Sequence, residues 1–225
     1  MPLLIPWADH QLIKPGANDP RVDLRTGILH VDAGNAYDLE DYFRYRSGGI
    51  ESHLHIPKNG HTFQYRDLLF EADANYLANP FAMSVETQGY GDGEWTDDQL
   101  AEIKRIMLYS AETPEIGIPL RKPEHWRDAG WGYHTMFEQW HPKPKSCPGR
   151  DRIEQYHDIL VPWMGRAKEN PTMAIEDLIL NSSERNRLAN NRVEELLKEL
   201  TTPAQEARAK LRSDAYAKAN PVRKG

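Results

Sequence analysis

The sequence has a single cysteine, no long apolar run and no excess of positive charge. One cysteine excludes a framework of internal disulfides, so any special role of this residue is as a thiol or a ligand. No stretch approaches the ~18 consecutive apolar residues that a membrane span needs. A formal net charge of −6 argues against broad attraction to nucleic acid, which depends on clustered positive charge.

The first ten residues also lack the basic segment that opens a standard secretory signal. We therefore expect the protein to be made in the cytoplasm, without export by that route. With a hydrophobic content of 39%, the 225 residues are sufficient for one domain of ordinary size with its own core, plus an additional segment.

Composition changes sharply near Gly165, and this change predicts the domain organisation. All nine histidines, all six tryptophans and the only cysteine lie before this residue. The residues that follow are mildly basic, and apolar residues repeat at helical spacing between Ile175 and Leu200. We expect an N-terminal extension at residues 1–26, a main domain at 27–164 and a helical tail at 165–225.

Local patterns before residue 165 mix strand and helix signals. Residues 27–31 form a β-rich run that ends at turn formers, and residues 81–86 form another. Residues 53–65 contain two short β-rich runs around Lys-Asn-Gly, a pattern typical of a hairpin. A capping box at Thr96 and Gln99 predicts the start of a helix. The expected fold class is α/β, with a mixed central β-sheet flanked by helices.

The stretch 130–149 has the densest set of reactive side chains, with His134, His141 and Cys147. A thiolate and neutral imidazoles are usual zinc ligands, and three of them leave a fourth position open for water. His30, at the end of a β-rich run, could supply a further ligand from a rigid strand end. The alternative is that Cys147 is a small buried apolar residue and that the histidines are surface groups. Spacing alone does not decide between the two.

Five motifs occur in an informative order. They are His30 after a β-rich run, Ser52-His-Leu-His-Ile with Lys58-Asn-Gly60 and Gln64-Tyr65, Ser84-Val-Glu86, Gly132-Tyr-His134, and Lys145-Ser-Cys-Pro-Gly149. Together they resemble the type 2 N-acetylmuramoyl-L-alanine amidases, relatives of peptidoglycan recognition proteins. The closest likeness is to amidase domains of endolysins from phages of actinobacteria, and it covers about residues 27–163. The resemblance implies a zinc groove at the strand ends of the sheet.

The resemblance also implies the ligands of this Zn²⁺ ion. His30 would be the first ligand and Cys147 the last. We assign His134 as the middle ligand, because it follows the Gly-x-Gly-Tyr pattern that similar endolysins have at the end of a strand. His141 is the alternative, although it lies only six residues before Cys147.

Two catalytic residues follow from the same resemblance. Glu86 matches a glutamate near the metal, where a carboxylate can take a proton from water and pass it to the leaving amine. Without the resemblance, Glu86 would be interpreted as a surface residue of an edge strand. Lys145 matches a lysine that stabilises an oxyanion, and is otherwise a solvated loop residue. Ser52 stands where some members have a tyrosine that acts near the metal. The expected catalytic roles in this chain therefore rest on Glu86 and Lys145.

Other chemistry-bearing residues allow two interpretations. His53 and His55 share one strand face, so together with His61 they could form a second metal site, whereas the resemblance implies that this strand is scaffold. Several aromatic residues near the predicted metal loop could stack on sugars or belong to the core. These are Trp126, Trp131, Phe137 and Trp140.

The resemblance implies hydrolysis of the amide between N-acetylmuramic acid and L-alanine in bacterial peptidoglycan, by a phage endolysin that lyses the cell wall of its host. Two alternatives are a muropeptide-binding module that does not cut and a zinc peptidase that cuts within the stem peptide. The tail is expected to carry no catalytic group and to serve self-association, wall attachment or packing against the main domain.

Overall fold

The computed structural model describes residues 2–13, 19–143 and 145–170, which belong to the first of two units of the chain, Met1–Asn181. The second unit, Ser182–Gly225, lies outside the described residues, as does most of the predicted helical tail. Within the described ranges, no helix combines the length and the apolar character required to cross a membrane.

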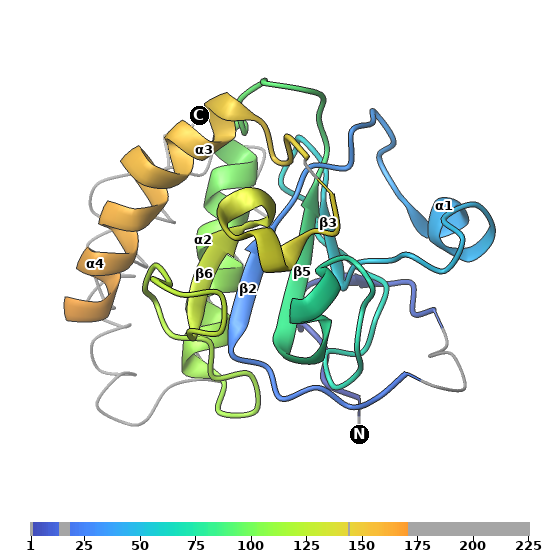
Figure 1. The fold of residues 1–225 in the computed structure, drawn as a ribbon, viewed down its shortest axis with the longest axis horizontal. Helices are drawn as coiled ribbons and strands as arrows, with labels where there is room; N and C mark the ends of the chain where they lie inside the picture. The colour runs from blue at the N-terminus through green and yellow to red at the C-terminus, as the bar shows by residue number, and fades with distance from the viewer. Residues whose placement is uncertain (1, 14–18, 144, 171–225) are drawn as a thin grey trace, which may run out of the picture. The chain divides into compact units, whose positions relative to one another are not determined.

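The described residues form a six-stranded sheet in the order β1-β4-β3-β5-β2-β6 (Figure 1). Strands β3, β5, β2 and β6 run parallel, β1 is parallel to β4, and only the pair β3 and β4 is antiparallel. The strands are β1 (Asp9–His10), β2 (Thr26–Leu29), β3 (Leu54–Ile56), β4 (Phe63–Gln64), β5 (Ala82–Thr87) and β6 (Gly130–Tyr133). The predicted mixed sheet and the hairpin within residues 53–65 are thereby confirmed.

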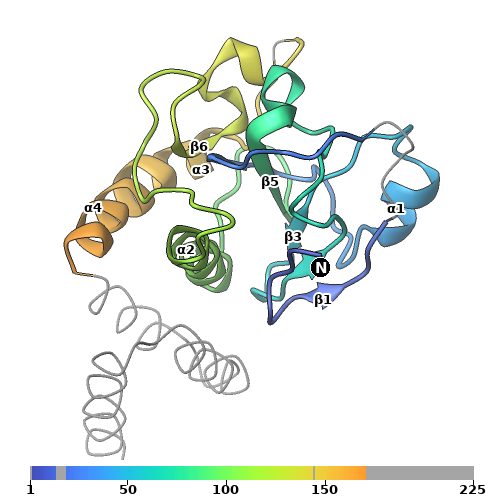
Figure 2. The same ribbon diagram turned by 90° about the horizontal axis from the view of Figure 1, so that it is seen from below.

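Helical segments cover both faces of this sheet. Figures 1 and 2 show α2 on one face and the 3-10 segments η1, η2 and η3 on the opposite face. The segments are α1 (Glu40–Tyr45), η1 (Tyr76–Phe81), α2 (Asp97–Glu112), η2 (His134–Met136), η3 (Glu138–Trp140), α3 (Arg150–Gln155), the π-helical η4 (Tyr156–Leu160) and α4 (Val161–Glu169). The predicted fold class is therefore confirmed.

Helix α2 begins at the predicted capping box. The Thr96 hydroxyl accepts a hydrogen bond from the Gln99 backbone N–H, and the Gln99 side chain accepts one from the Thr96 N–H, each at 3.1 Å. These two bonds satisfy backbone donors that a helix start otherwise leaves unpaired. The Gln99 amide also donates to the carbonyl of Ile56, so the same residue ties α2 to the end of β3.

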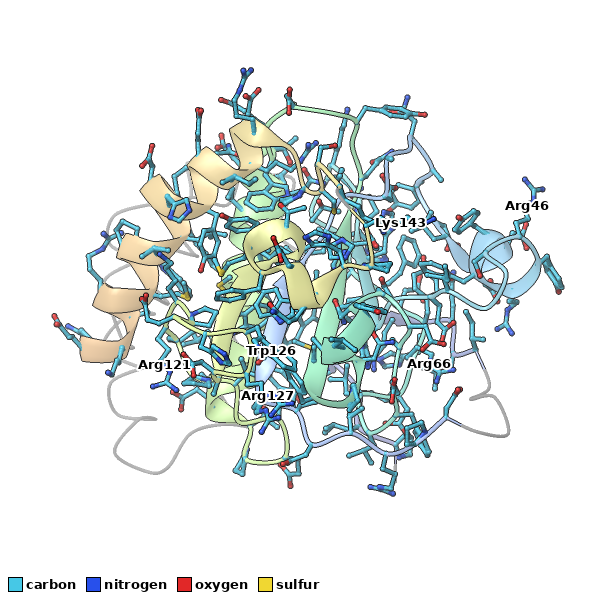
Figure 3. The ribbon with its side chains drawn as sticks, in the orientation of Figure 1. Arg46, Arg66, Arg121, Trp126, Arg127 and Lys143 are labelled. Atoms are coloured by element: carbon cyan, nitrogen blue, oxygen red, sulfur yellow. The ribbon has the colours of Figure 1, made fainter. Side chains whose placement is uncertain are left out.

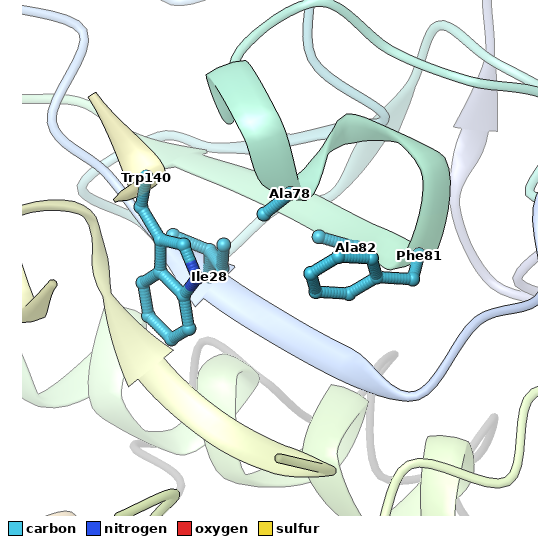
Figure 4. Packing of buried hydrophobic residues seen from close by; sticks show 5 residues of the cluster. All are labelled: Ile28, Ala78, Phe81, Ala82 and Trp140. Atoms are coloured by element: carbon cyan, nitrogen blue, oxygen red, sulfur yellow. The ribbon is translucent and has the colours of Figure 1, made fainter. Parts of the chain in front are cut away.

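The core on the face opposite α2 lies beneath the 3-10 segments, as Figure 4 shows. It consists of Ile28, Ala78, Phe81, Ala82 and Trp140. The indole of Trp140 packs so close to β6 that a Cβ at Gly132 would lie 2.8 Å from it. Glycine is therefore required at this position, because it lets η3 pack directly against the strand that leads to His134.

Residues outside the predicted main domain contribute to the same packed unit. Ile5 and Trp7 are buried, and β1 pairs with β4 at the edge of the sheet. At the other end, α4 continues through Gly165, and three of its side chains are buried: Trp163, Met164 and Ala167. Elements of the same packed unit therefore lie on both sides of residue 26 and of residue 164.

Candidate metal centre

The candidate site lies at the carboxyl ends of the parallel strands. Strand register places His30, which follows β2, between Glu86 of β5 and His134, which follows β6. His55 of β3 pairs with Glu86 on its other side. Paired residues of parallel strands point to the same face of a sheet. The sheet therefore presents three imidazoles and one carboxylate in a row across four strands, at the edge where open α/β sheets bind ligands.

Three predicted ligands converge at one end of this row. His30, His134 and Cys147 each place a ligand atom within 4.8 Å of the other two. The Nδ1 of His30 lies 3.9 Å from the Sγ of Cys147, and the ring centroids of His30 and His134 are 4.2 Å apart. Cys147 reaches this position from the loop before α3, where its Sγ accepts a hydrogen bond from the Val31 N–H at 3.2 Å. Across the described part of the chain, no other three His, Cys, Asp or Glu side chains are close enough to share an ion.

Burial keeps both histidines in the neutral form that binds metal ions. It lowers the pKa of His30 to about 4, and, together with the charges of His30 and Lys145, it lowers the pKa of His134 to about 2. Burial also raises the pKa of the Cys147 thiol to about 12, and the Glu86 carboxylate adds to that effect. The Nε2 of His134 is buried and has no hydrogen-bond partner among the residues that the structure describes. An orphaned buried nitrogen of this kind indicates a missing partner such as an ion.

The donor set fits zinc. Two neutral imidazoles and one thiolate are typical zinc ligands, and three protein ligands leave a fourth position open for water or substrate. The buried thiol must lose its proton to bind, and a divalent cation favours that ionisation. His30, His134 and Cys147 are therefore suited to hold Zn²⁺.

Glu86 lies beside these three residues on the central strand β5, with 15% of its side chain exposed. Its Oε1 lies 3.8 Å from the Nδ1 of His30 and accepts a hydrogen bond from the Ser52 hydroxyl at 3.3 Å. Its Oε2 is buried and has no hydrogen-bond partner in the described part of the chain. Burial and the nearby Asp32 carboxylate raise the pKa of Glu86 to about 8, against the opposing effects of Ser52 and Lys145. The interpretation of Glu86 as a surface residue of an edge strand is wrong. A carboxyl group with this pKa can both take and release a proton near neutral pH.

Lys145 is exposed in the loop that leads to Cys147. Its positive charge nevertheless lowers the pKa of His30, of Glu86, of His134 and of the Cys147 thiol. The ammonium group therefore lies close enough to act on the whole site while it remains accessible. A cation in this place can stabilise negative charge that develops on a bound substrate.

The structure places His141 next to the three converging residues but not among them. Its ring centroid lies 5.9 Å from that of His134, and its Nδ1–H donates to the carbonyl of Lys143 at 2.6 Å. His141 is half-buried in the loop that connects η3 to Cys147. It contributes to the low pKa of His134 through its charge.

His53, His55 and His61 each have a different partner. His53 is fully buried, with one ring nitrogen bonded to the Ser84 hydroxyl and the other donating to a backbone carbonyl. The Nε2 of His55 lies 3.2 Å from the Oδ2 of Asp32, and His61 is only half-buried near β1. The described residues therefore do not bring these histidines together as a second metal site.

The aromatic residues of this region belong mostly to the core. Trp131 and Trp140 are fully buried, and Phe137 packs against the core on the face opposite α2. Figure 3 shows Trp126 toward the amino ends of the strands and Lys143 toward their carboxyl ends. Trp126 therefore lies away from the metal loop, and like Phe137 it is half-buried against the core.

Comparison with known proteins shows the fold. No protein-family model and no curated protein matches the sequence. The endolysin N-acetylmuramoyl-L-alanine amidase LysCS from Clostridium intestinale URNW matches with a TM-score of 0.50 at 13% identity, over 68% of this chain and 96% of that one. Drosophila peptidoglycan recognition protein SA matches with a TM-score of 0.53 at 12% identity, over 68% and 92%. This chain has the fold shared by these amidases and recognition proteins.

A human member of this amidase and recognition-protein fold matches as well. Human peptidoglycan recognition protein IβC, in complex with glycosamyl muramyl pentapeptide, has a TM-score of 0.52 at 9% identity, over 69% of this chain and 97% of that one. The resemblance inferred from five short motifs thus extends to the arrangement of strands and helices. Within this fold, the three converging residues lie at the carboxyl edge of the sheet.

Three polar residues of the site were not singled out from the sequence. Asn75 accepts a hydrogen bond from the Nε2–H of His30, and Asp32 accepts two from backbone N–H groups. Arg152 is buried and donates to the carbonyl of Pro148, which fixes the loop around Cys147. Asp32 could have been found, because it follows His30 by two residues. Asn75 and Arg152 carried no local signal, since their contacts depend on the fold.

Proposed function

We propose that the chain hydrolyses the amide bond between the lactyl group of N-acetylmuramic acid and L-alanine in bacterial peptidoglycan, with Zn²⁺ as its cofactor. The observation that supports this proposal is the convergence of His30, His134 and Cys147 at the carboxyl edge of an amidase-type sheet. A module that only binds muropeptides has no need of a complete set of zinc donors beside a buried carboxyl group.

His30, His134 and Cys147 would hold the zinc ion. In this position zinc supplies a Lewis acid for the scissile carbonyl and lowers the pKa of the attacking water. The protein contributes two imidazoles that burial keeps neutral and a loop that Arg152 holds in place. The residues that move protons and stabilise charge lie immediately beside these ligands.

Glu86 carries the proton. In its ionised form it accepts a proton from the attacking water, and in its protonated form it delivers that proton to the nitrogen that leaves with L-alanine. A pKa of about 8 suits both halves of this transfer, because neither form is strongly disfavoured near neutral pH. Ser52 donates to one carboxylate oxygen, which orients the group and leaves the other oxygen for the proton.

Lys145 would stabilise the tetrahedral intermediate. The scissile carbonyl oxygen becomes negatively charged when water attacks, and the Lys145 charge already acts on every neighbouring group of the site. Its exposed position lets the side chain reach a bound substrate without breaking a contact in the core.

The test combines zinc analysis with product identification. The full chain is purified, its zinc content is measured, and it is incubated with a muropeptide of defined structure. Mass spectrometry should show a free lactyl carboxyl group and a stem peptide that begins with L-alanine. Glu86→Ala should keep its zinc and its fold, while its hydrolysis rate falls ~10²–10⁴-fold. Glu115→Ala changes an exposed glutamate and should keep the wild-type rate. Fragments cut within the stem peptide would instead identify a peptidase.

Muropeptide recognition without hydrolysis is the second candidate function. It is favoured by one observation, the shared fold with the human recognition protein that was solved with a glycosamyl muramyl pentapeptide. Binding of the muropeptide by the zinc-loaded chain, without release of any product over hours, would support recognition and reject the amidase proposal.

The biological setting that we propose is the degradation of a bacterial cell wall by an endolysin made in the host cytoplasm. LysCS is itself named an endolysin. Residues after Asn170 would serve wall attachment or self-association and carry no catalytic group. Truncation after Asn170 leaves α4 whole. The truncated chain should hydrolyse soluble muropeptide normally and intact walls more slowly. A folded, zinc-loaded truncation that fails on soluble muropeptide would show that these residues complete the site.

A further inference from the structure

Within the described ranges, the imidazole of His30 is hydrogen-bonded to one side chain outside the metal site. Its Nε2 lies 2.8 Å from the Oδ1 of Asn75, and both residues are buried. An amide oxygen can only accept, so Nε2 must carry the proton of the neutral ring. The other ring nitrogen, Nδ1, is then left with its lone pair. This is the nitrogen that lies 3.9 Å from the Sγ of Cys147 and 3.8 Å from Glu86.

Hydrogen bonds hold the backbone at Asn75 in place, whereas the Nδ2 of its side chain is buried without a partner among the described residues. Its backbone N–H donates to the Oδ1 of Asn79 at 2.6 Å, and the Asn79 amide donates onward to Asp73 at 3.1 Å. The next residue, Tyr76, has a φ of +52°, a conformation that is costly for any residue with a side chain. Tyr76 is about half exposed, so burial of its side chain does not explain this conformation. The strained residue of this turn therefore comes directly after Asn75, the residue that contacts His30.

We propose that Asn75 is a positioning residue of the metal centre, which fixes the tautomer and the ring orientation of His30 so that Nδ1 is the ligand atom. The inference deepens the proposed function, because it rests on the same zinc site. Partners that accept a hydrogen bond from the second ring nitrogen of a ligand histidine orient the ring and raise its basicity. Without the acceptor, the proton of the neutral ring can move to Nδ1 and form a hydrogen bond to Glu86. A protonated Nδ1 cannot bind zinc.

The experiment measures the affinity of the full chain for Zn²⁺ alone, by competition with a chromophoric chelator. Asn75→Leu removes the acceptor at similar size and should weaken zinc binding ~10–100-fold. Asn75→Asp keeps an acceptor and should bind zinc at least as well as the wild type. Asn35→Leu makes the same chemical change at an exposed position and should leave the affinity unchanged. Equal affinities for Asn75→Leu and the wild type, or equal losses in both Asn75 variants, would overturn the proposal.

A second measurement reads the tautomer directly. Nitrogen-15 NMR of the metal-free protein should show His30 protonated at Nε2 in the wild type and in Asn75→Asp, and protonated partly or wholly at Nδ1 in Asn75→Leu. If Asn75→Leu does not fold, the Asn75→Asp protein alone decides, because loss of either zinc affinity or the Nε2–H form in this variant contradicts the proposal. Neither readout depends on hydrolysis. A wild-type protein that binds zinc without cutting muropeptide would therefore refute the amidase proposal and leave this one standing.

Discussion

Replacement of Glu86 by glutamine should stabilise the metal-free protein, although it should abolish most of the proposed activity. Glu86 has a buried carboxyl group whose pKa is raised from 4.5 to about 8, first by burial and then by the Asp32 carboxylate. Glutamine has the shape of the protonated acid and can still accept the hydrogen bond from Ser52. The substitution therefore removes only the ability to become charged in a buried place.

The magnitude follows from the difference between the folded and unfolded pKa values. Below pH 4.5 the carboxyl group of Glu86 is protonated in both states, so the group has no effect on the free energy of unfolding. Between pH 4.5 and about 8 only the unfolded state is ionised, so stability falls as the pH rises. At about 1.4 kcal/mol per pH unit, the wild type loses about 3 kcal/mol by pH 7 and about 5 kcal/mol above pH 8. The glutamine variant has no such loss.

The assay is urea unfolding of both proteins with a chelator present, followed by tryptophan fluorescence at several pH values from 4.5 to 8.5. Other ionisable groups cancel in the comparison, because both proteins share them. Glu115→Gln is the matched control, since that glutamate is exposed and should give no pH-dependent difference. Added zinc should reduce the difference in the free energy of unfolding between Glu86→Gln and the wild type, because a nearby cation favours the ionised carboxylate. If the two proteins have the same free energy of unfolding at pH 8, or if their difference is equal at pH 4.5 and pH 8, the assignment of a raised pKa to Glu86 is refuted.

Three further substitutions test the fold and the site. Gly27→Ala would place a Cβ 2.3 Å from the indole of Trp131, so it should destabilise the protein by ~1–3 kcal/mol in urea unfolding; an unchanged midpoint would contradict this packing. Lys145→Ala should leave zinc content unchanged and lower the hydrolysis rate ~10²–10³-fold, and a loss of zinc instead would assign it a role in metal binding. Arg152→Met removes the hydrogen bonds of a buried guanidinium to the carbonyls of Gly91 and of Pro148, which follows Cys147. It should cost about 1.5–3 kcal/mol per lost bond and weaken zinc binding, whereas an intact zinc affinity would show that the loop of Cys147 does not need Arg152.

The elements predicted from the sequence are those whose signals are local. The capping box at Thr96 and Gln99 specifies a helix start with two hydrogen bonds between neighbouring residues, and α2 begins there. The hairpin within residues 53–65 needs only two short β-rich runs and a turn that can adopt positive φ, which Gly60 supplies at +73°. Such features require no knowledge of the rest of the chain, since the atoms that form them are already close along the backbone.

The sequence also indicated the chemistry, through residue type and order. A single cysteine and histidines that follow β-rich runs left zinc as one of two open interpretations. Only the resemblance of five ordered motifs to the amidases selected the three ligands and implied that Glu86 is the proton carrier. Spacing could not show that His30, His134 and Cys147 meet, because more than a hundred residues separate the first from the other two. Only the parallel pairing of β2 and β6 brings His30 and His134 together, and the loop before α3 then carries Cys147 to them.

The tertiary structure alone decided the environment of these residues. Glu86 lies on a central strand rather than at an edge, and its altered pKa arises from burial and from Asp32, neither of which is visible along the chain. The contact between His30 and Asn75 likewise joins two segments that the sheet folds together. Sequence fixes which functional groups the protein has, whereas desolvation and second partners arise only when distant segments pack against one another. For this protein, those effects set the protonation states on which the proposed chemistry depends.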